Sequence, residues 1–288
     1  MGSVHVALRT QGPRSNRIKH ARWSTHVILA IISVSMILPF LWMISSSLKL
    51  ENEVFSMPIR WIPSVIRWSN YVEVWRRAPF GIYYWNTTLL TFGTVVTQLA
   101  TSSLAGYVFA RLKFPERDAL FFTYLGTLMV PFMVIMIPQF TVIRVLGLFD
   151  TLWAVYLIRA FSPFGTFLFR QFFSTIPFEL SDSARIDGCS EFRIYRTIIM
   201  PLSRPAIATL VVFFFSFTWN DFLGPLIYLT SDTNKTIQLG LRGFVTLYNQ
   251  DYALLMAAAV VAMFPIMVLY VFLQRYFVEG IAMTGLKG

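Results

Sequence analysis

Acidic and basic side chains that could bind a charged partner are concentrated in one short segment of the sequence. Between Ser181 and Pro201 the chain carries Asp182, Arg185, Asp187, Glu191, Arg193 and Arg196. Asp182 and Arg185 are three residues apart, so on a helix they share a face. Long apolar stretches flank the segment on both sides. This pattern fits either a contact surface for another protein or a solvated amphipathic connector.

The same segment is predicted to form a helix, a turn and a second helix. Ser174 or Thr175 is expected to cap the first helix, and Ser190 is expected to cap the second. Gly188 suits the left-handed backbone conformation that often ends a helix. Pro201 lies where the second helix must bend or stop. Such an element would present a knob at the surface of the protein.

Two ionisable residues lie inside apolar stretches, where a charge is costly and by default marks a functional site. Asp221 follows Trp219 and Asn220, and these three residues are candidates for a translocation pathway or a gate. Alternatively, Asp221 lies near the outer mouth or pairs with a neighbouring helix. For Arg159 we favour a structural pairing, because Ser162 and Pro163 nearby indicate irregular backbone.

Residues that could support catalysis or metal binding are sparse. Cys189 is the only cysteine, so no disulfide or cysteine metal cluster can form within the chain. The three histidines, His5, His20 and His26, all lie near the N-terminus, which excludes an internal histidine site. No G-x-x-x-x-G-K-[ST] run is present to cradle ATP phosphates. We therefore predict that the chain is not an enzyme and binds no cofactor or metal.

The composition is typical of a membrane protein. Of the 288 residues, 56% are hydrophobic and only 13% are charged, compared with about a quarter in soluble domains. The formal net charge of +10 could suggest nucleic-acid binding. However, the basic residues lie in short connectors and do not cluster on one solvated face, so we expect no nucleic-acid partner.

Six apolar stretches predict six transmembrane helices, since about 20 apolar residues cross the hydrocarbon core as a helix. Backbone amides in lipid must be satisfied within their own segment, and no alternating pattern supports a barrel, so the predicted fold class is all-α. The first stretch could be a signal peptide, but its length and the lack of a clear cleavage site favour an uncleaved span. The predicted spans are Val27–Leu48, Trp85–Ala110, Ala119–Ile143, Thr151–Phe169, Ile207–Leu229 and Ala253–Leu273.

The orientation follows from the basic residues in the connectors, which are enriched on the cytoplasmic side of membrane proteins. One side receives fifteen lysines and arginines and the other receives seven. Both termini should therefore be cytoplasmic. The predicted parts are a basic N-terminal segment (1–24), a six-helix transmembrane domain (25–275) with a cytoplasmic loop at about 174–204, and a cytoplasmic tail (276–288).

The loop resembles the "EAA" loop of ATP-binding-cassette (ABC) importer permeases. The matching runs are Ile176-Pro177-Phe178-Glu179-Leu180, Asp182-Ser183-Ala184, Ile186-Asp187-Gly188, Pro201-Leu202 and Arg204-Pro205-Ala206. In that family the loop is a coupling helix that sits in a cleft of a cytoplasmic ATPase subunit. Asp182-Ser183-Ala184 replaces the usual Glu-Ala-Ala, which keeps the charge on a shorter arm. The resemblance assigns coupling to Asp182, Ser183, Ala184, Asp187, Gly188, Arg193 and Pro201.

Further motifs are similar to the maltose-type carbohydrate branch of this family. Asn70-Tyr71 with Trp75, and the run from Phe217 to Phe222, match its external segment and its fifth helix. The C-terminus resembles the tail of the second maltose permease subunit, which reaches between two ATPase subunits. This likeness makes Gly285, Lys287 and Gly288 candidate tail contacts.

The resemblance implies a type I ABC importer permease in a bacterial inner membrane, forming half of a carbohydrate pathway. Its expected partners are a second homologous permease, two ATPase subunits that bind ATP and Mg²⁺, and an extracytoplasmic sugar-binding protein. The alternative is an ion-coupled secondary transporter or a channel subunit. Such proteins usually carry several ionisable residues along their spans, whereas this chain offers Asp221, Arg159 and little else.

Overall fold

The computed structural model describes residues 14–244 and 251–285, without the side chains of residues 14–22, 24 and 276–285. These residues form helices and connectors, with no strand among them. The α-helices are α1 (Arg14–Ser47), α2 (Glu51–Val54), α3 (Ser69–Arg77), α4 (Phe80–Arg111), α5 (Arg117–Gly126), α6 (Phe132–Val145), α7 (Leu152–Arg159), α8 (Pro163–Thr175), α9 (Glu179–Ile186), α10 (Glu191–Ile194), α11 (Met200–Leu202), α12 (Arg204–Trp219), α13 (Leu223–Tyr228), α14 (Ile237–Arg242) and α15 (Tyr252–Gly285). Two short 3₁₀ helices are η1 (Thr127–Met129) and η3 (Asp232–Asn234), and η2 (Tyr195–Ile199) is a π-helix.

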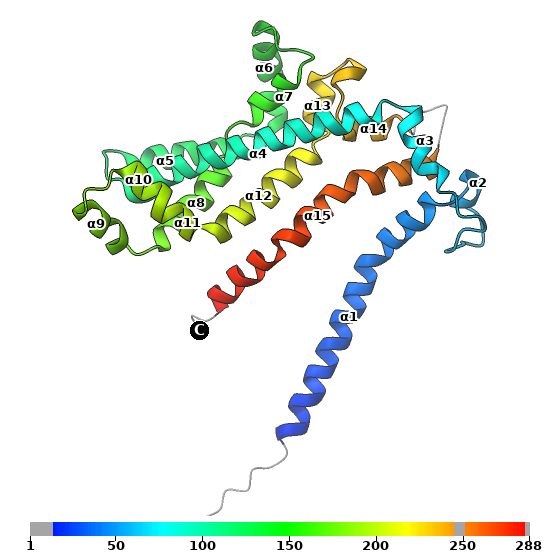
Figure 1. Cartoon of the computed structure of the whole chain (residues 1–288), viewed down its shortest axis with the longest axis horizontal. Coiled ribbons are helices and arrows are strands. Elements are labelled where there is room, and N and C mark those ends of the chain that lie inside the picture. Colours follow the sequence, from blue (N-terminus) through cyan, green and yellow to red (C-terminus); the bar gives the residue numbers. More distant parts are fainter. Residues whose placement is uncertain (1–13, 245–250, 286–288) are drawn as a thin grey trace, which may run out of the picture.

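The long helix α4 is the centre of the arrangement. Helices α8 and α12 pack against it, α15 packs against α12, and α1 meets α15 near the end of α1 (Figure 1). The end of α4 lies together with α9, α10 and α11 at one end of the molecule. Helices α2, α3 and α14 lie at the opposite end, so α4 joins the two ends.

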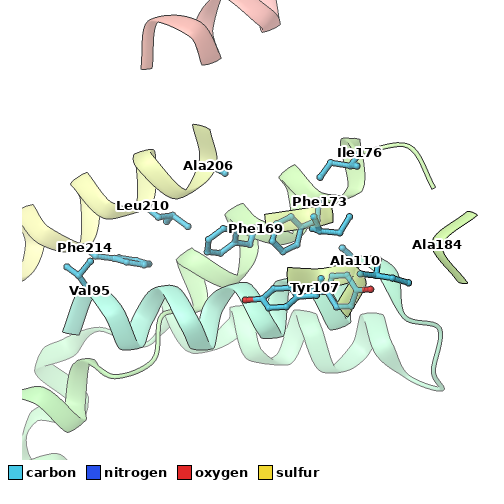
Figure 2. Close-up of a cluster of buried hydrophobic side chains, with 13 residues drawn as sticks. Val95, Tyr107, Ala110, Phe169, Phe173, Ile176, Ala184, Ala206, Leu210 and Phe214 are labelled. Atoms are coloured by element: carbon cyan, nitrogen blue, oxygen red, sulfur yellow. The ribbon is translucent and has the colours of Figure 1, made fainter. Parts of the chain in front are cut away.

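Small residues allow α4, α8 and α12 to approach closely. A Cβ atom at Gly106 of α4 would lie 2.6 Å from the Cβ of Phe169, and one at Gly165 of α8 would lie 2.6 Å from Phe214. Small residues at helix contacts are typical of membrane proteins, in which van der Waals packing drives association. The buried side chains between these helices form the cluster in Figure 2, which includes Val95, Tyr107, Phe169, Phe173, Leu210 and Phe214.

Three helical segments are long and apolar enough to cross a membrane, or up to five if each bent helix pair counts as one span. They are Thr25–Ser47, Leu152–Thr175 and Tyr252–Arg275. Helix α4 has 32 residues but is not among them. The reason is its polar face, which packs against neighbouring helices: Asn86, Thr87, Thr91, Thr94, Gln98, Ser102, Ser103 and Arg111 are all buried. The prediction of apolar spanning helices is thus confirmed for at least three segments.

Several predicted spans are interrupted at proline or glycine. The segments Arg117–Met129 and Phe132–Val145 meet at 97°, and Pro131 lies at the break. Pro163 begins α8, where the Ser162 hydroxyl accepts a hydrogen bond from Gly165 N at 3.0 Å. This bond satisfies one of the backbone groups that an interrupted membrane helix leaves free.

Candidate coupling loop and pathway site

The loop between α8 and α12 has the helix–turn–helix shape that its sequence predicts. Gly188 has φ +78°, and no described atom lies within 4 Å of the position that a Cβ would occupy there. The Ser190 hydroxyl caps α10 by accepting a hydrogen bond from Arg193 N at 3.4 Å. The predicted cap at Ser174 or Thr175 is wrong, because α8 continues through Thr175 and α9 begins at Glu179 without a side-chain cap.

Most residues assigned to coupling are exposed on this loop. Ala184 is the exception, since it is only 7% exposed and packs into the cluster of Figure 2. Two apolar side chains point outward beside the charged residues: Ile186 is 87% exposed and Phe192 is 62% exposed. The candidate residues did not include these two, although a helix that buries Ala184 must turn Ile186 away. The exposed assigned residues are Asp182, Ser183, Asp187, Gly188, Arg193 and Pro201.

Arg185 organises the charges of the loop. It donates to Asp182 Oδ1 at 2.6 Å, so the shared helix face predicted from their spacing is confirmed. It also donates to Glu191 Oε1 at 2.7 Å, across the turn at Gly188. The hydrogen bond from Arg185, with a smaller contribution from one donated by Tyr107, holds the pKa of the Glu191 carboxyl below its usual range. Both short helices are therefore fixed to each other through one guanidinium group.

A second polar site lies where α12 ends and α13 begins. Asp221 is buried there, and its Oδ2 accepts a hydrogen bond from Arg159 Nε at 2.8 Å. Gly224 N donates to Asp221 Oδ1 at 3.3 Å, and a side chain at Gly224 would collide with this carboxylate. Arg159 therefore has the structural pairing that we favoured for it. Asp221 pairs with α7, the neighbouring helix that ends at Arg159, which is one of the alternatives given above.

A pocket of about 680 Å³ opens beside this ion pair. Asn220 and Asp221 line it, whereas Trp219 points away and donates from Nε1 to Ala262 O of α15 at 2.8 Å. The other lining residues are three phenylalanines, two aliphatic residues, one serine and the paired arginine: Phe213, Phe217, Phe222, Val212, Leu223, Ser216 and Arg159. Aromatic faces beside hydrogen-bonding groups are the kind of surface that carbohydrate rings can contact.

The C-terminal candidates lie at or beyond the end of the described residues. Gly285 is the last residue of α15, and its surroundings are outside the described side chains. Lys287 and Gly288 lie outside the described residues. The tail contact therefore stays a prediction.

Comparison with known proteins identifies the family. Residues 101–283 match the family described as "Binding-protein-dependent transport system inner membrane component". The chain belongs to this family. The matched residues include both the coupling loop and the pocket at Asp221, so the two sites lie within the part that defines the family.

Curated relatives of this transport component match almost its whole length. The arabinooligosaccharides transport system permease protein AraQ of Halalkalibacterium halodurans is 35% identical over 92% of this chain and 96% of its own. The melibiose/raffinose/stachyose import permease protein MelC of Bacillus subtilis is 32% identical over 96% and 100%. The sn-glycerol-3-phosphate transport system permease protein UgpE of Yersinia enterocolitica is 33% identical over 89% and 94%.

A solved structure supports the same fold. The chain resembles a subunit of a bacterial ABC transporter that imports the acidic polysaccharide alginate, with a TM-score of 0.80 and 24% identity. The match covers 92% of this chain and 98% of that subunit. The fold is therefore that of a type I ABC importer permease, as predicted.

Proposed function

We propose that this chain is one permease half of an ATP-driven carbohydrate importer in a bacterial inner membrane. Two of the relatives named above are sugar permeases by name, and a third carries sn-glycerol-3-phosphate, so a carbohydrate is the substrate class best supported. The observation that carries the proposal is the loop surface, where Ile186 and Phe192 are exposed between charged side chains. An apolar centre with a charged rim is the usual composition of a protein contact.

The proposed mechanism is alternating access. Closure of two ATPase subunits, which bind ATP and Mg²⁺, moves the coupling loop and opens the pathway toward an extracytoplasmic sugar-binding protein. Hydrolysis then resets the complex. A second homologous permease supplies the other half of the pathway, and the chain itself performs no catalysis.

In this proposal the pocket at the end of α12 belongs to the sugar pathway. Asn220 and Ser216 offer hydrogen-bonding groups, and Phe217 offers an exposed aromatic ring. The Asp221–Arg159 ion pair fixes the break between α12 and α13. Trp219 anchors the end of α12 to α15. We thus assign pathway contact to Asn220 and Asp221 and support to Trp219.

The proposed topology has six spans with both termini and the loop at 174–204 in the cytoplasm. The spans correspond to α1, α4, α5 with α6, α7 with α8, α12 with α13, and α15. Residues 1–24 then form the cytoplasmic N-terminal segment, and residues 276–288 form the tail. Gly285, Lys287 and Gly288 would contact the ATPase pair. This topology rests on the distribution of basic residues.

The experiment compares two matched substitutions in the complex purified with its partners. Ile186→Lys should release the ATPase subunits, because burying an unpaired ammonium group at a contact is costly. Ile62→Lys changes an equally exposed isoleucine in the connector between α2 and α3 and should retain them. Retention of ATPase subunits by Ile186→Lys would contradict the proposed surface. Transport that follows an ion gradient without ATP would favour the alternative carrier.

A further inference from the structure

Three polar residues at the end of α4 bind the coupling loop at three separate points. Ser103, Tyr107 and Arg111 are spaced by four residues, so they lie on one face of the helix. All three are buried, with exposed fractions of 0%, 4% and 4%. Figure 2 shows Tyr107 on this face of α4, within the cluster that α8 and the loop complete. We call these three residues the α4 polar stripe.

Each member of the stripe has a different partner along the loop. Arg111 Nη2 donates to Ile176 O at 2.7 Å, where α8 ends and the loop begins. Tyr107 Oη donates to Glu191 Oε2 at 2.6 Å, at the start of α10. The Ser103 hydroxyl and the Tyr195 hydroxyl share a hydrogen bond of 2.7 Å. The stripe therefore holds the start of the loop and its second short helix, α10, with the first residue of η2.

The contacts continue from the stripe to the exposed face of α9. Glu191, which accepts from Tyr107, also accepts from Arg185, and Arg185 pairs with Asp182. The Arg111 guanidinium lies over the ring of Phe178 at 4.4 Å, directly before α9. An outward-facing carboxylate of the loop is thus connected to α4 through side-chain hydrogen bonds.

Helix α4 carries a second set of contacts, toward the pathway site. Gln98 Nε2 donates to Arg159 O at 2.5 Å, and the Thr97 hydroxyl shares a hydrogen bond of 2.6 Å with the Tyr156 hydroxyl. Arg159 is the residue that pairs with Asp221. At 1.5 Å per residue, Gln98 lies only about 14 Å along the helix from Tyr107. One helix therefore bonds both to the coupling loop and to the backbone of Arg159, whose side chain forms the pathway ion pair.

We propose that the α4 polar stripe joins the coupling loop to α4 as one rigid body and that α4 transfers loop movement to the Arg159–Asp221 pair. This inference rests on the proposed function and assigns positioning roles to Ser103, Tyr107 and Arg111. The physical reason is that breaking a buried hydrogen bond leaves its donor or acceptor unsatisfied, which costs free energy. If the loop slid along α4, the stripe would lose its partners without gaining water. The loop and α4 must therefore move together.

The test removes a single hydroxyl from the stripe. Tyr107→Phe keeps the ring in its cluster and deletes the bond to Glu191. A hydrogen bond to a charged acceptor changes an equilibrium constant by about a factor of ten or more. We therefore expect the amount of sugar transported per ATP hydrolysed to fall about tenfold. ATPase subunits should stay bound, since the exposed loop surface is unchanged. The readouts are ATP hydrolysis, sugar uptake and ATPase retention in the purified complex.

Tyr228→Phe is the matched control. Tyr228 is fully buried, and its hydroxyl has no hydrogen-bond partner in the described part of the chain. Its removal should leave the ratio of sugar to ATP unchanged. Ser103→Ala provides a second variant of the stripe, with Ser46→Ala as its control, because the Ser46 hydroxyl is also buried without a partner among the described residues.

A double substitution shows whether the effect comes from the bond itself. Tyr107→Phe and Glu191→Gln should be strongly non-additive, since both weaken one contact. Suppose that the unaltered complex is active and that Tyr107→Phe and Ser103→Ala both keep a normal ratio of sugar transported to ATP hydrolysed. That result would overturn the positioning role of the α4 polar stripe and leave the proposed function intact. An unaltered complex that transports without hydrolysing ATP would overturn the proposed function, and the inference with it.

Discussion

Gly188 has a backbone conformation that few other residues tolerate. Its φ of +78° turns the chain between α9 and α10, and it allows Arg185 to reach Glu191 on the far side of the turn. There is open space around it among the described atoms, so the constraint is conformational and not steric. Loss of glycine here should change the relative orientation of the two short helices.

Gly188→Val should therefore impair coupling without impairing membrane insertion. A β-branched residue at positive φ costs about 1–2 kcal/mol in backbone strain, whereas asparagine tolerates this region. Substrate-stimulated ATP hydrolysis measured in both variants checks this, with Gly188→Asn as the control. Equal, normal activity in the valine variant would show that the turn has no role in coupling.

The ion pair at Asp221 makes a second residue-scale prediction. Asp221→Ala leaves the Arg159 guanidinium without its partner beside a buried site, and breaking such a pair typically costs about 3 kcal/mol. The double variant Asp221→Leu with Arg159→Met should unfold less readily than Asp221→Ala alone, because neither charge remains. Thermal unfolding in detergent provides the measurement. If the double variant proves the less stable of the two, the pair is not the feature that holds this site.

At the scale of elements, the sequence predicted the loop better than the helix contacts. Gly188, Ser190 and the Asp182–Arg185 spacing act over a few residues, so local rules place them correctly. The failure at Ser174 and Thr175 also has a local cause. Both hydroxyls donate to carbonyl groups of their own helix, so α8 simply continues through them.

Contacts between distant residues could not be predicted from one sequence. Tyr107 and Glu191 are 84 residues apart, and Arg159 and Asp221 are 62 apart. The sequence identified Arg159 and Asp221 as unusual because each interrupts an apolar stretch. It did not identify Tyr107, since a buried tyrosine in a helix looks like ordinary packing until its hydroxyl partner is known.

The close approach of α4 and α8 depends on Gly106, whose side chain is a single hydrogen atom. Gly106→Ala would place a Cβ 2.6 Å from Phe169 Cβ and 3.1 Å from the backbone nitrogen of Arg170, so the two helices would have to separate. We expect a loss of about 1–3 kcal/mol in the free energy of unfolding. Gly126→Ala is the matched control, because no described atom lies within 4 Å of the added carbon. Equal unfolding temperatures for the two variants would contradict this account of the contact.

At the scale of the whole molecule, the arrangement of α4 fixes which surfaces share a side of the membrane. Arg111, at the end of α4, is bonded to Ile176 at the start of the coupling loop. Lys113, two residues further along, must therefore lie on the same side as the loop. The connector that contains Ile62 lies at the opposite end, with α2 and α3 (Figure 1).

Cysteine labelling tests the proposed orientation. In a Cys189→Ala background, Lys113→Cys should react with a membrane-impermeant maleimide only from the cytoplasmic side, and Ile62→Cys only from the outside. Both positions are exposed, so access is limited by the membrane alone. Reaction of both cysteines from one side would refute the topology.

The polar face of α4 has a consequence for biosynthesis. This helix leaves the ribosome before α8 and α12, which pack against it, and before α7 and η2, which hold the hydrogen-bond partners of Thr97, Gln98 and Ser103. About 100 further residues must be made before α12 is complete, which takes about 5–20 s at ordinary rates of translation. During that interval the polar side chains of α4 lack these partners, and unpaired polar groups are costly in lipid. Its insertion should therefore depend on a protein that shelters it, and depletion of a membrane insertase should affect α4 before it affects α1.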